Sequence, residues 1–425
     1  MADKTNIPQG YRDSLLGIIP KDWEVKRLGD VCDIDKQSLS SSTDPEYEFY
    51  YISLSDVNSE RFEIRSSRQV FKTAPSRARR IIKKGDVVIS TVRPNLQAFI
   101  FIRENVKDVI VSTGFAVLTP KKILGEYLFH YIFSQSVTKQ FYQLVVGSNY
   151  PAVNSSDVYH LKISVPPYIE QQGIVSVISL WNTAIEKQSE LIEQLKLRKH
   201  ALMQQLLTGK KRLPGFKGEW VYRKLGDVCT FLSNNTLSRE QLNQNSGTIS
   251  DIHYGDVLIK YPTILDCEKE RIPYIVEDAY NQSMTDFVKD GDIVMSDTAE
   301  DFTVGRACEI HNVGKMKILA GLHTFLFRPN VGLFSPYFLG YYINSEAYHK
   351  QLISLIQGIK VCSIGKTAIK KTILAIPPFD EQKEISTILR LCDIEIEKVR
   401  LKRDEIITKK RGLMQQLLTG NKRII

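Results

Sequence analysis

The octapeptide Leu-Met-Gln-Gln-Leu-Leu-Thr-Gly fills residues 202–209 and returns unchanged at residues 413–420. Upstream of each copy, apolar residues recur at steps of three, four and seven. Each of these stretches opens with a Pro-Pro pair, at 166–167 and at 377–378. Proline at the start of a helix and glycine after its end are the expected boundary signals. The sequence therefore predicts two helices of about 38 residues, or roughly 57 Å each.

Each predicted helix carries a single apolar stripe with a few polar interruptions, and such a stripe needs a partner helix. Because the nearest candidate is the other copy, we predict an antiparallel coiled coil within the chain. A coiled coil between two chains is the alternative. The predicted seam consists of Ile174, Ile178, Trp181, Ile185, Ile192, Leu195, Leu202, Leu206, Ile385, Leu389, Ile396, Val399, Ile406, Leu413 and Leu417.

The duplication extends beyond the helices. Residues 23–32 read WEVKRLGDVC and residues 220–229 read WVYRKLGDVC. A period of roughly 200 residues is far too long for a solenoid and indicates duplicated domains. Between the shared motifs, residues 33–150 and 230–358 have little in common beyond one Gly-Asp-(Val/Ile) strand. One part of the repeat is fixed and the other varies, as expected for two readers of different targets on a shared frame.

The chain is therefore predicted to be α/β (α+β), with two globular target-recognition domains joined by two long antiparallel coiled-coil helices in a pseudo-two-fold internal repeat. The recognition domains are expected at 1–165 and 220–376, where short β-branched runs follow Gly-Asp turns. The spacer helices are expected at 166–209 and 377–425, with a linker at 210–219.

Composition narrows the function classes. The 425 residues carry a formal net charge of +9, with 43% hydrophobic and 25% charged residues. A basic surplus fits a polyanionic partner such as nucleic acid. No apolar run approaches the length of a membrane span, so we expect a cytoplasmic protein. The six cysteines form no CxxC pair, and we expect neither a disulfide framework nor a metal site.

Two stretches resemble catalytic motifs but lack an essential residue. Residues 165–168 and 376–379 imitate the (D/N/S)PP(F/Y) motif of adenine methyltransferases, but Val165 and Ile376 cannot accept a hydrogen bond from an adenine amino group. Residues 365–367 resemble the end of a Walker A loop whose first glycine is missing. We therefore expect no catalytic residues, and an enzyme with an unrecognised site finds no support in a paired acid or a Cys–His constellation.

The motifs, taken in order, resemble the specificity subunits of type I restriction-modification systems over nearly the whole chain. The resemblance rests on Trp-x4-LGDV, a Gly-Asp-(Val/Ile) strand and a PP-x-x-EQ helix ending in QQLLTG, all present twice. It implies that each domain reads one half of a split, asymmetric site in double-stranded DNA, with the helices as a ruler for the gap.

The same resemblance implies partners. Two modification (methyltransferase) subunits, which carry S-adenosylmethionine, would dock on the frame and methylate adenine, while the chain itself binds no cofactor. It leaves open whether a translocating restriction subunit joins them. The competing hypothesis is a coiled-coil scaffold with two protein-binding α/β domains, which a test of salt-dependent DNA binding would separate.

A DNA reader needs Lys and Arg for phosphates, and polar side chains for base edges. Loops that flank the predicted strands supply candidates of both kinds. The candidate DNA-binding residues are Arg77, Arg79, Arg80, Arg93, Asn95, Ser148, Asn149 and Tyr150 in the first domain, and Arg306, Lys315, Lys317, His323, Lys360 and Ser363 in the second.

Overall fold

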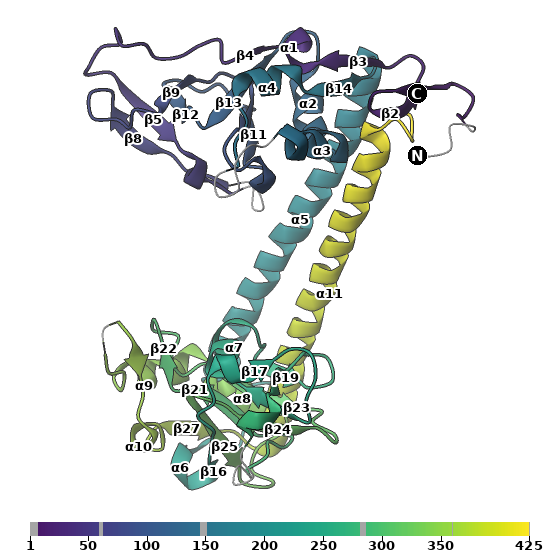
Figure 1. Cartoon of the computed structure of the whole chain (residues 1–425). Coiled ribbons are helices and arrows are strands. Elements are labelled where there is room, and N and C mark those ends of the chain that lie inside the picture. Colours follow the sequence, from purple (N-terminus) through teal and green to yellow (C-terminus); the bar gives the residue numbers. More distant parts are fainter. Residues whose placement is uncertain (1–6, 59–62, 145–150, 281–285, 359, 425) are drawn as a thin grey trace. The chain divides into compact units, whose positions relative to one another are not determined.

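A computed structural model describes residues 7–58, 63–144, 151–280, 286–358 and 360–424. The chain divides into two compact units. Unit 1 combines Met1–Gln188 with Lys402–Ile425, and unit 2 is Ser189–Leu401. Each unit contains one α/β domain and a part of both long helices (Figure 1).

Unit 1 contains two four-stranded sheets, with the strand orders β11-β10-β13-β4 and β8-β5-β12-β9. Its strands are β1 (Tyr11–Ser14), β2 (Gly17–Pro20), β3 (Glu24–Arg27), β4 (Cys32–Ile34), β5 (Glu48–Ile52), β6 (Val57–Asn58), β7 (Glu63–Ile64), β8 (Ser67–Val70), β9 (Ala78–Ile81), β10 (Val87–Ser90), β11 (Phe99–Phe101), β12 (Val109–Ser112), β13 (Phe115–Pro120) and β14 (Lys162–Val165). Its shorter helices are α1 (Leu28–Val31), α2 (Gly125–Tyr131), α3 (Gln135–Leu144) and α4 (Ser155–His160).

Strand β10 lies inside the first four-stranded sheet of unit 1, between β11 and β13. All four of its residues are buried, and it follows a turn in which Gly85 has a φ of 89°. This left-handed conformation favours glycine and explains the Gly-Asp signal at the start of the strand. The main core of the unit packs Trp23 and the inner face of β10 against Ile174, Ile178 and Leu417 of the long helices.

Unit 2 contains a five-stranded sheet of order β16-β25-β21-β23-β19 and a four-stranded sheet of order β17-β20-β18-β24. Its strands are β15 (Val221–Lys224), β16 (Cys229–Leu232), β17 (Leu242–Asn243), β18 (Ile249–Ile252), β19 (Ile264–Asp266), β20 (Tyr274–Ile275), β21 (Ile293–Ser296), β22 (Thr298–Ala299), β23 (Ala307–His311), β24 (Lys317–Ala320), β25 (Thr324–Pro329), β26 (Cys362–Ser363) and β27 (Ile373–Ile376). Its shorter helices are α6 (Leu225–Val228), α7 (Tyr254–Ile259), α8 (Phe338–Ile343), α9 (Glu346–Ile353) and α10 (Lys366–Ile369). The buried strand β21 lies between β25 and β23, as β10 lies between β13 and β11 in unit 1.

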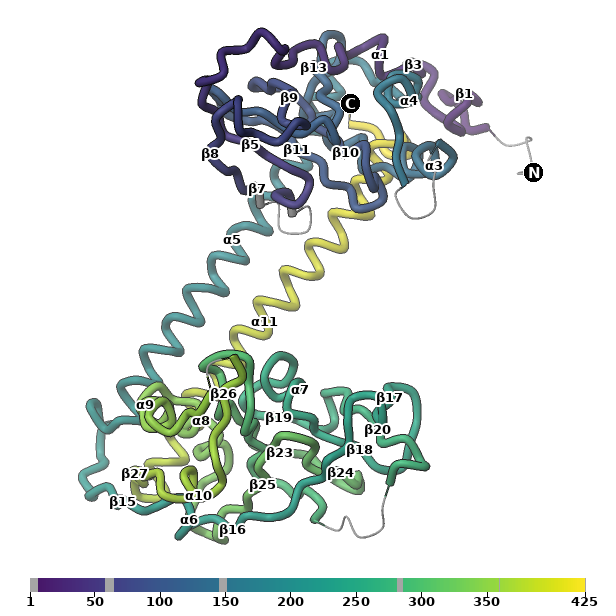
Figure 2. Tube along the Cα trace, turned by 60° about the vertical axis from the view of Figure 1, so that its left-hand side comes forward, coloured from purple at the N-terminus to yellow at the C-terminus, as the bar shows by residue number. Residues whose placement is uncertain are grey.

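The two long helices are α5 (Tyr168–Leu206, 39 residues) and α11 (Phe379–Leu418, 40 residues). They lie side by side in both views (Figure 1 and Figure 2). In unit 1, Ile174 near the start of α5 shares a core with Leu417 near the end of α11, and in unit 2 Leu206 shares one with Ile385. The start of each helix therefore meets the end of the other.

The predicted antiparallel pair within the chain is confirmed. All fifteen predicted seam residues are described, and each is buried or half-buried. The turns after the helices use Gly209 (φ 69°) and Gly420 (φ 74°), as the C-terminal glycine signal indicates. Both helices lie inside the predicted spacers, while the predicted domain limits stay a prediction.

Candidate nucleic-acid interface

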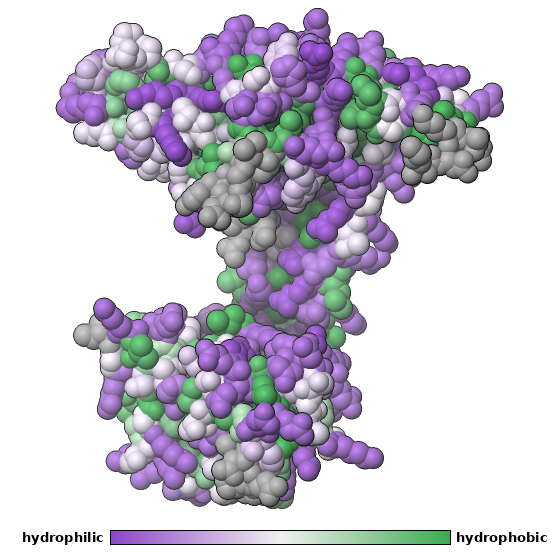
Figure 3. Space-filling model, in the orientation of Figure 1, coloured by the Kyte–Doolittle hydropathy of each residue, from purple (hydrophilic) through white to green (hydrophobic). Residues whose placement is uncertain are grey.

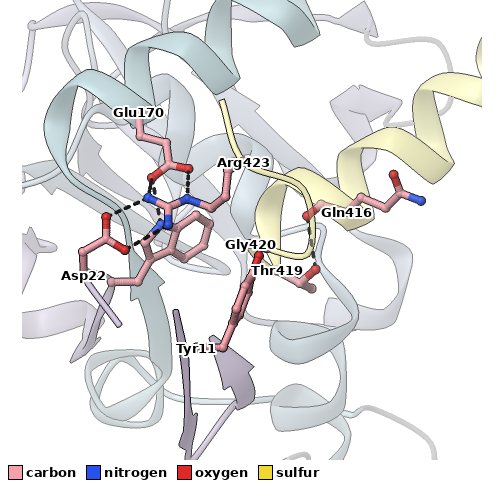
Figure 4. A network of polar contacts seen from close by, with 8 residues as sticks. Tyr11, Asp22, Glu170, Gln416, Thr419, Gly420 and Arg423 are labelled. Atoms are coloured by element: carbon pink, nitrogen blue, oxygen red, sulfur yellow. Dashed lines mark hydrogen bonds and ion pairs between the residues drawn. The ribbon is translucent and has the colours of Figure 1, made fainter. Parts of the chain in front are cut away.

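A buried glutamate fixes the start of α5 to the last residues of the chain (Figure 4). The carboxylate of Glu170 accepts hydrogen bonds from Nε and Nη2 of Arg423, at 2.6 and 2.8 Å, and from the indole Nε1 of Trp23 at 2.9 Å. Asp22 accepts two further bonds from the same guanidinium. These hydrogen bonds, with that to Glu170 first, raise the pKa of Arg423, so its guanidinium stays charged.

Unit 2 repeats this arrangement with equivalent residues. Glu381, at the start of α11, accepts from Nε and Nη2 of Arg212 at 2.6 and 2.7 Å, and from Nε1 of Trp220 at 3.2 Å. We call each set a Trp–Glu–Arg clamp. The sequence placed both glutamates in a first helical turn without revealing the arginine partner. The available signal was the Lys-Arg pair that follows both octapeptides.

The glutamine after each glutamate joins the helix to its own domain. Gln171 accepts a hydrogen bond from the backbone N–H of Leu124 at 2.8 Å, and Gln382 accepts one from Ser335 at 2.9 Å. Each glutamine also donates to the carbonyl of the first proline of the Pro-Pro pair. The repeated PP-x-x-EQ motif is therefore the joint between a long helix and a recognition domain.

The variable part of unit 1 presents a short two-stranded ribbon. Residues 91–93 run beside 151–153, where the N–H of Val153 donates to the carbonyl of Thr91 at 2.9 Å and the N–H of Arg93 donates to that of Pro151 at 2.7 Å. Residues 93–97 follow as the tip. Arg93 and Gln97 both have φ of 50°, a left-handed conformation that costs about 1 kcal/mol for such residues. Strain of this kind concentrates at functional loops.

Unit 2 builds the same ribbon from different side chains. Strand β22 pairs with β26, and the N–H of Ile364 donates to the carbonyl of Asp297 at 2.9 Å. This bond is the counterpart of the one between Val153 and Thr91. The tip of the second ribbon is 300–303. The two ribbons thus share a main-chain frame, although their exposed residues differ.

The first-domain candidates separate into exposed and internal groups. Arg93 and Asn95 are exposed at the tip, and Arg77 is exposed at the start of β9. Arg79 lies over the ring of Phe71, 4.8 Å from its centroid. Ser148, Asn149 and Tyr150 lie outside the described residues.

Arg80 is held inside unit 1 and is better placed to stabilise it than to contact DNA. Its guanidinium pairs with Asp35 and donates to Ser155, and its side chain is 14% exposed. Burial lowers its pKa despite the neighbouring carboxylate. Because Ser155 follows the ribbon directly, this contact fixes β9 beside it.

In the second domain, His323 and Ser363 meet at the ribbon. His323 has a φ of 55°, and its Nδ1 lies 3.3 Å from a carboxylate oxygen of Asp297 and 3.4 Å from the hydroxyl of Thr298. Ser363 pairs with Thr298 across the ribbon. Lys360 is exposed just before β26.

The other second-domain candidates lie elsewhere. Arg306 donates to the carbonyls of Leu258 and Tyr261, so it closes the end of α7 and has a structural role. Lys315 and Lys317 are exposed at the opposite end of β24 from His323. The structure therefore does not bring these two lysines together with His323.

A buried aspartate supports the loop that carries His323. Asp251 is fully buried, and its carboxylate accepts from Nδ2 of Asn235 at 2.6 Å. A Cβ atom on Gly321 would lie 2.3 Å from the other carboxylate oxygen, so only glycine fits there. Burial raises the pKa of Asp251 to about 7. Sequence inspection gave no signal for this residue.

Hydrophobic side chains on the face seen in Figure 3 gather only in small patches among hydrophilic ones. Within the described part of the chain, no group of His, Cys, Asp and Glu residues is arranged to hold a metal ion. The helices described there also include none long and apolar enough to cross a membrane.

Solved structures share this fold. A chain from a study of complex assembly in a type I R-M system matches with a TM-score of 0.64 at 24% identity, covering 94% of this chain and 97% of that one. The HsdS subunit from Thermoanaerobacter tengcongensis matches with a TM-score of 0.50 at 22% identity, covering 95% and 98%.

Sequence comparison gives the family. The specificity subunit of the type I restriction enzyme MjaVIII from Methanocaldococcus jannaschii is 24% identical, over 96% of this chain and 94% of its own length. The HindI specificity subunit from Haemophilus influenzae is 26% identical over 43% and 40%. The model of the type I restriction modification DNA specificity domain matches twice, at residues 20–197 and 217–406. The chain therefore belongs to the family of type I restriction modification DNA specificity domains.

Proposed function

We propose that this chain is the DNA-recognition subunit of a type I restriction-modification complex, and that each of its two domains reads one half of a split, asymmetric DNA site. The observation that carries the proposal is the pair of ribbons. Two domains with unlike sequences present equivalent main-chain ribbons with different exposed side chains. A shared frame with variable tips is the arrangement that two independent readers require.

The proposal includes partners that perform the chemistry. Two modification subunits carry S-adenosylmethionine and methylate adenine, and the chain contributes recognition without a catalytic role. The two Trp–Glu–Arg clamps support this stoichiometry, because they give each unit an equivalent frame and hence two equivalent places for one kind of partner. If the host genome also encodes a restriction subunit, that subunit joins the same complex. Because its DNA target lies in the cytoplasm of the host, the proposal places this chain there too.

Electrostatics support a DNA partner. The chain carries a net charge of +9, and exposed cations such as Arg77, Arg93 and Lys360 lie at or near the ribbons. Phosphate contacts by such side chains release counterions, so affinity falls steeply as salt rises. A protein-binding scaffold would show no comparable salt slope with duplex DNA.

The first experiment maps N6-methyladenine across the host genome, with the gene present and with it deleted. A split, asymmetric motif that disappears on deletion supports the proposal and reveals the target. An unchanged methylome calls for a second measurement, the binding of purified protein to random duplex DNA at several salt concentrations. Weak binding without salt dependence would then refute the proposal.

A further inference from the structure

Each ribbon tip exposes one large apolar side chain. Leu96 is 59% exposed and Phe302 is 67% exposed. Each lies six residues after the serine that ends the central strand, Ser90 of β10 or Ser296 of β21. A single exposed apolar residue is ordinary on a protein surface. The same feature at equivalent places in two otherwise unlike domains indicates a shared task.

Hydrogen bonds fix the main chain of both tips, by different means. In the first tip, the N–H of Leu96 donates to the carbonyl of Arg93 at 2.9 Å, inside the turn bounded by the left-handed residues. In the second tip, the ring of His349 on α9 bonds to the carbonyl of Phe302 at 2.9 Å. The side chain of Asp301 accepts from the N–H of Thr303 at 2.9 Å. Both apolar groups therefore project from a fixed main chain.

The polar neighbours differ between the tips. The first tip offers Arg93 and Asn95, which suit the acceptor edges of guanine and the mixed edge of adenine. The second tip offers Glu300 and Asp301, which accept hydrogen bonds and suit the amino group of cytosine. An apolar side chain beside such groups suits the methyl group of thymine, the one apolar feature in the major groove.

On the basis of the proposed function, we propose that Leu96 and Phe302 are specificity-determining residues, each contacting a thymine methyl group in the half-site of its own domain. The polar residues beside each one read the adjoining base pairs. The tips therefore enter the major groove, and the differences between them make the two half-sites different.

The experiment uses the full chain with its own modification subunits. Leu96→Ala and Phe302→Ala are each expressed, and the methylated motif is mapped. In each variant, the preference for thymine at one position of one half-site is expected to fall roughly tenfold. The other half-site should be recognised as in the wild type. Leu15→Ala and Val331→Ala remove exposed apolar groups away from the tips, at 77% and 103% exposure, and should change nothing.

A second measurement reports on the methyl group itself. Synthetic duplexes carry the mapped motif with deoxyuridine in place of each thymidine in turn, and binding of the purified chain is measured. One such substitution per half-site should weaken binding of the wild-type chain. The same substitution should have no effect on the variant that lacks the matching tip residue. A purely structural role for Leu96 or Phe302 would lower binding to every duplex alike.

The outcomes separate the two proposals. A mapped split motif that both tip variants leave intact, or that contains no thymine in a half-site, overturns the role of the tips and leaves the proposed function standing. If deoxyuridine weakens binding of the wild-type chain at no position, the role of the tips is likewise overturned and the proposed function stands. A wild-type chain that directs no split motif and binds no DNA overturns the proposed function, and the role of the tips with it.

Discussion

At the scale of single residues, the Trp–Glu–Arg clamps make the most specific demand. Glu170 is 5% exposed, so its carboxylate depends on Arg423 for a counter-charge. Removing one partner of a buried ion pair leaves the other charge without compensation, at a cost of about 3 kcal/mol. We therefore expect Arg423→Ala to loosen unit 1, and Arg212→Ala to loosen unit 2.

Hydrogen–deuterium exchange in the full chain checks this prediction. Arg423→Ala should accelerate exchange around Trp23 and at the start of α5, whereas Arg212→Ala should do so around Trp220 and at the start of α11. The two variants are controls for each other. If both variants loosen the same unit, or if neither changes exchange, the clamps do not stabilise their units independently.

A buried histidine makes unit 1 sensitive to acid. His130 is 4% exposed, its Nε2 has no hydrogen-bond partner, and burial lowers its pKa to about 3. Between roughly pH 6.5 and pH 3 the unfolded chain takes up a proton that the folded chain refuses, so stability is lost as the pH falls. The loss should reach about 2 kcal/mol at pH 5.

Chemical denaturation at pH 7 and pH 5 tests this effect. His130→Phe should reduce the difference between the two pH values by most of that amount, while replacement of the exposed His160 by Phe should not. An equal pH dependence in wild type and His130→Phe would show that other groups cause the acid sensitivity.

At the scale of elements, the helix pair contains two equivalent lysines with unequal partners. Lys199 in unit 2 bonds to the carboxylate of Asp393, which also accepts from the hydroxyl of Tyr341. Lys410 in unit 1 donates to the neutral amide oxygen of Asn182, and its nearest favourable charge is the carboxylate of Glu186, to which no hydrogen bond is formed among the described contacts. Burial lowers the pKa of Lys410. The lysine in unit 2 therefore has a hydrogen-bonded counter-charge, whereas the hydrogen-bond acceptor of the lysine in unit 1 is neutral.

Asn182→Asp should correct this imbalance. The new carboxylate would pair with Lys410 and stabilise unit 1 by about 1–3 kcal/mol, since hydrogen bonds to charged groups contribute on that scale. Slower hydrogen exchange in the neighbouring turns of α5 and α11 would report the gain. Asp393→Asn is the mirror-image control and should destabilise unit 2. An Asn182→Asp variant that exchanges faster would mean that desolvation outweighs the pairing.

How far the sequence predicted the structure also differs between elements. The helix seam followed from periodicity, because each apolar position is set by its neighbours three, four and seven residues away. The ribbons could not be predicted from periodicity, because their hydrogen bonds join residues such as Thr91 and Val153, which are far apart in the sequence and are connected by no local pattern. The same limit explains the DNA candidates. Composition identified Arg80 and Arg306 as cations, but only the fold shows that both are engaged inside their domains.

At the scale of the whole molecule, α5 and α11 both run through the two units, so their length is expected to set the spacing of the half-sites. Inserting one heptad after Gln188 and one after Leu401, at the boundaries between the units, lengthens both helices by ~10 Å and keeps the seam in register. At ~3.4 Å per base pair, the unspecified gap should widen by about three base pairs.

Methylome mapping of this insertion variant tests whether the helix length sets the gap between the half-sites. Unaltered half-sites with a wider gap are expected. A heptad in only one helix serves as the control and should abolish methylation, because it shifts one seam against the other. An unchanged gap in the double insertion would refute the role of the helices as a ruler.

The hydrogen bonds that build the ribbons have an evolutionary consequence. They join main-chain atoms, as between Thr91 and Val153 or Asp297 and Ile364, so substitutions at the tips leave them in place. Exposed tip residues can therefore drift at small cost to folding. A host under attack by changing phages could acquire a new target through a few substitutions there, without any change to the clamps or the long helices.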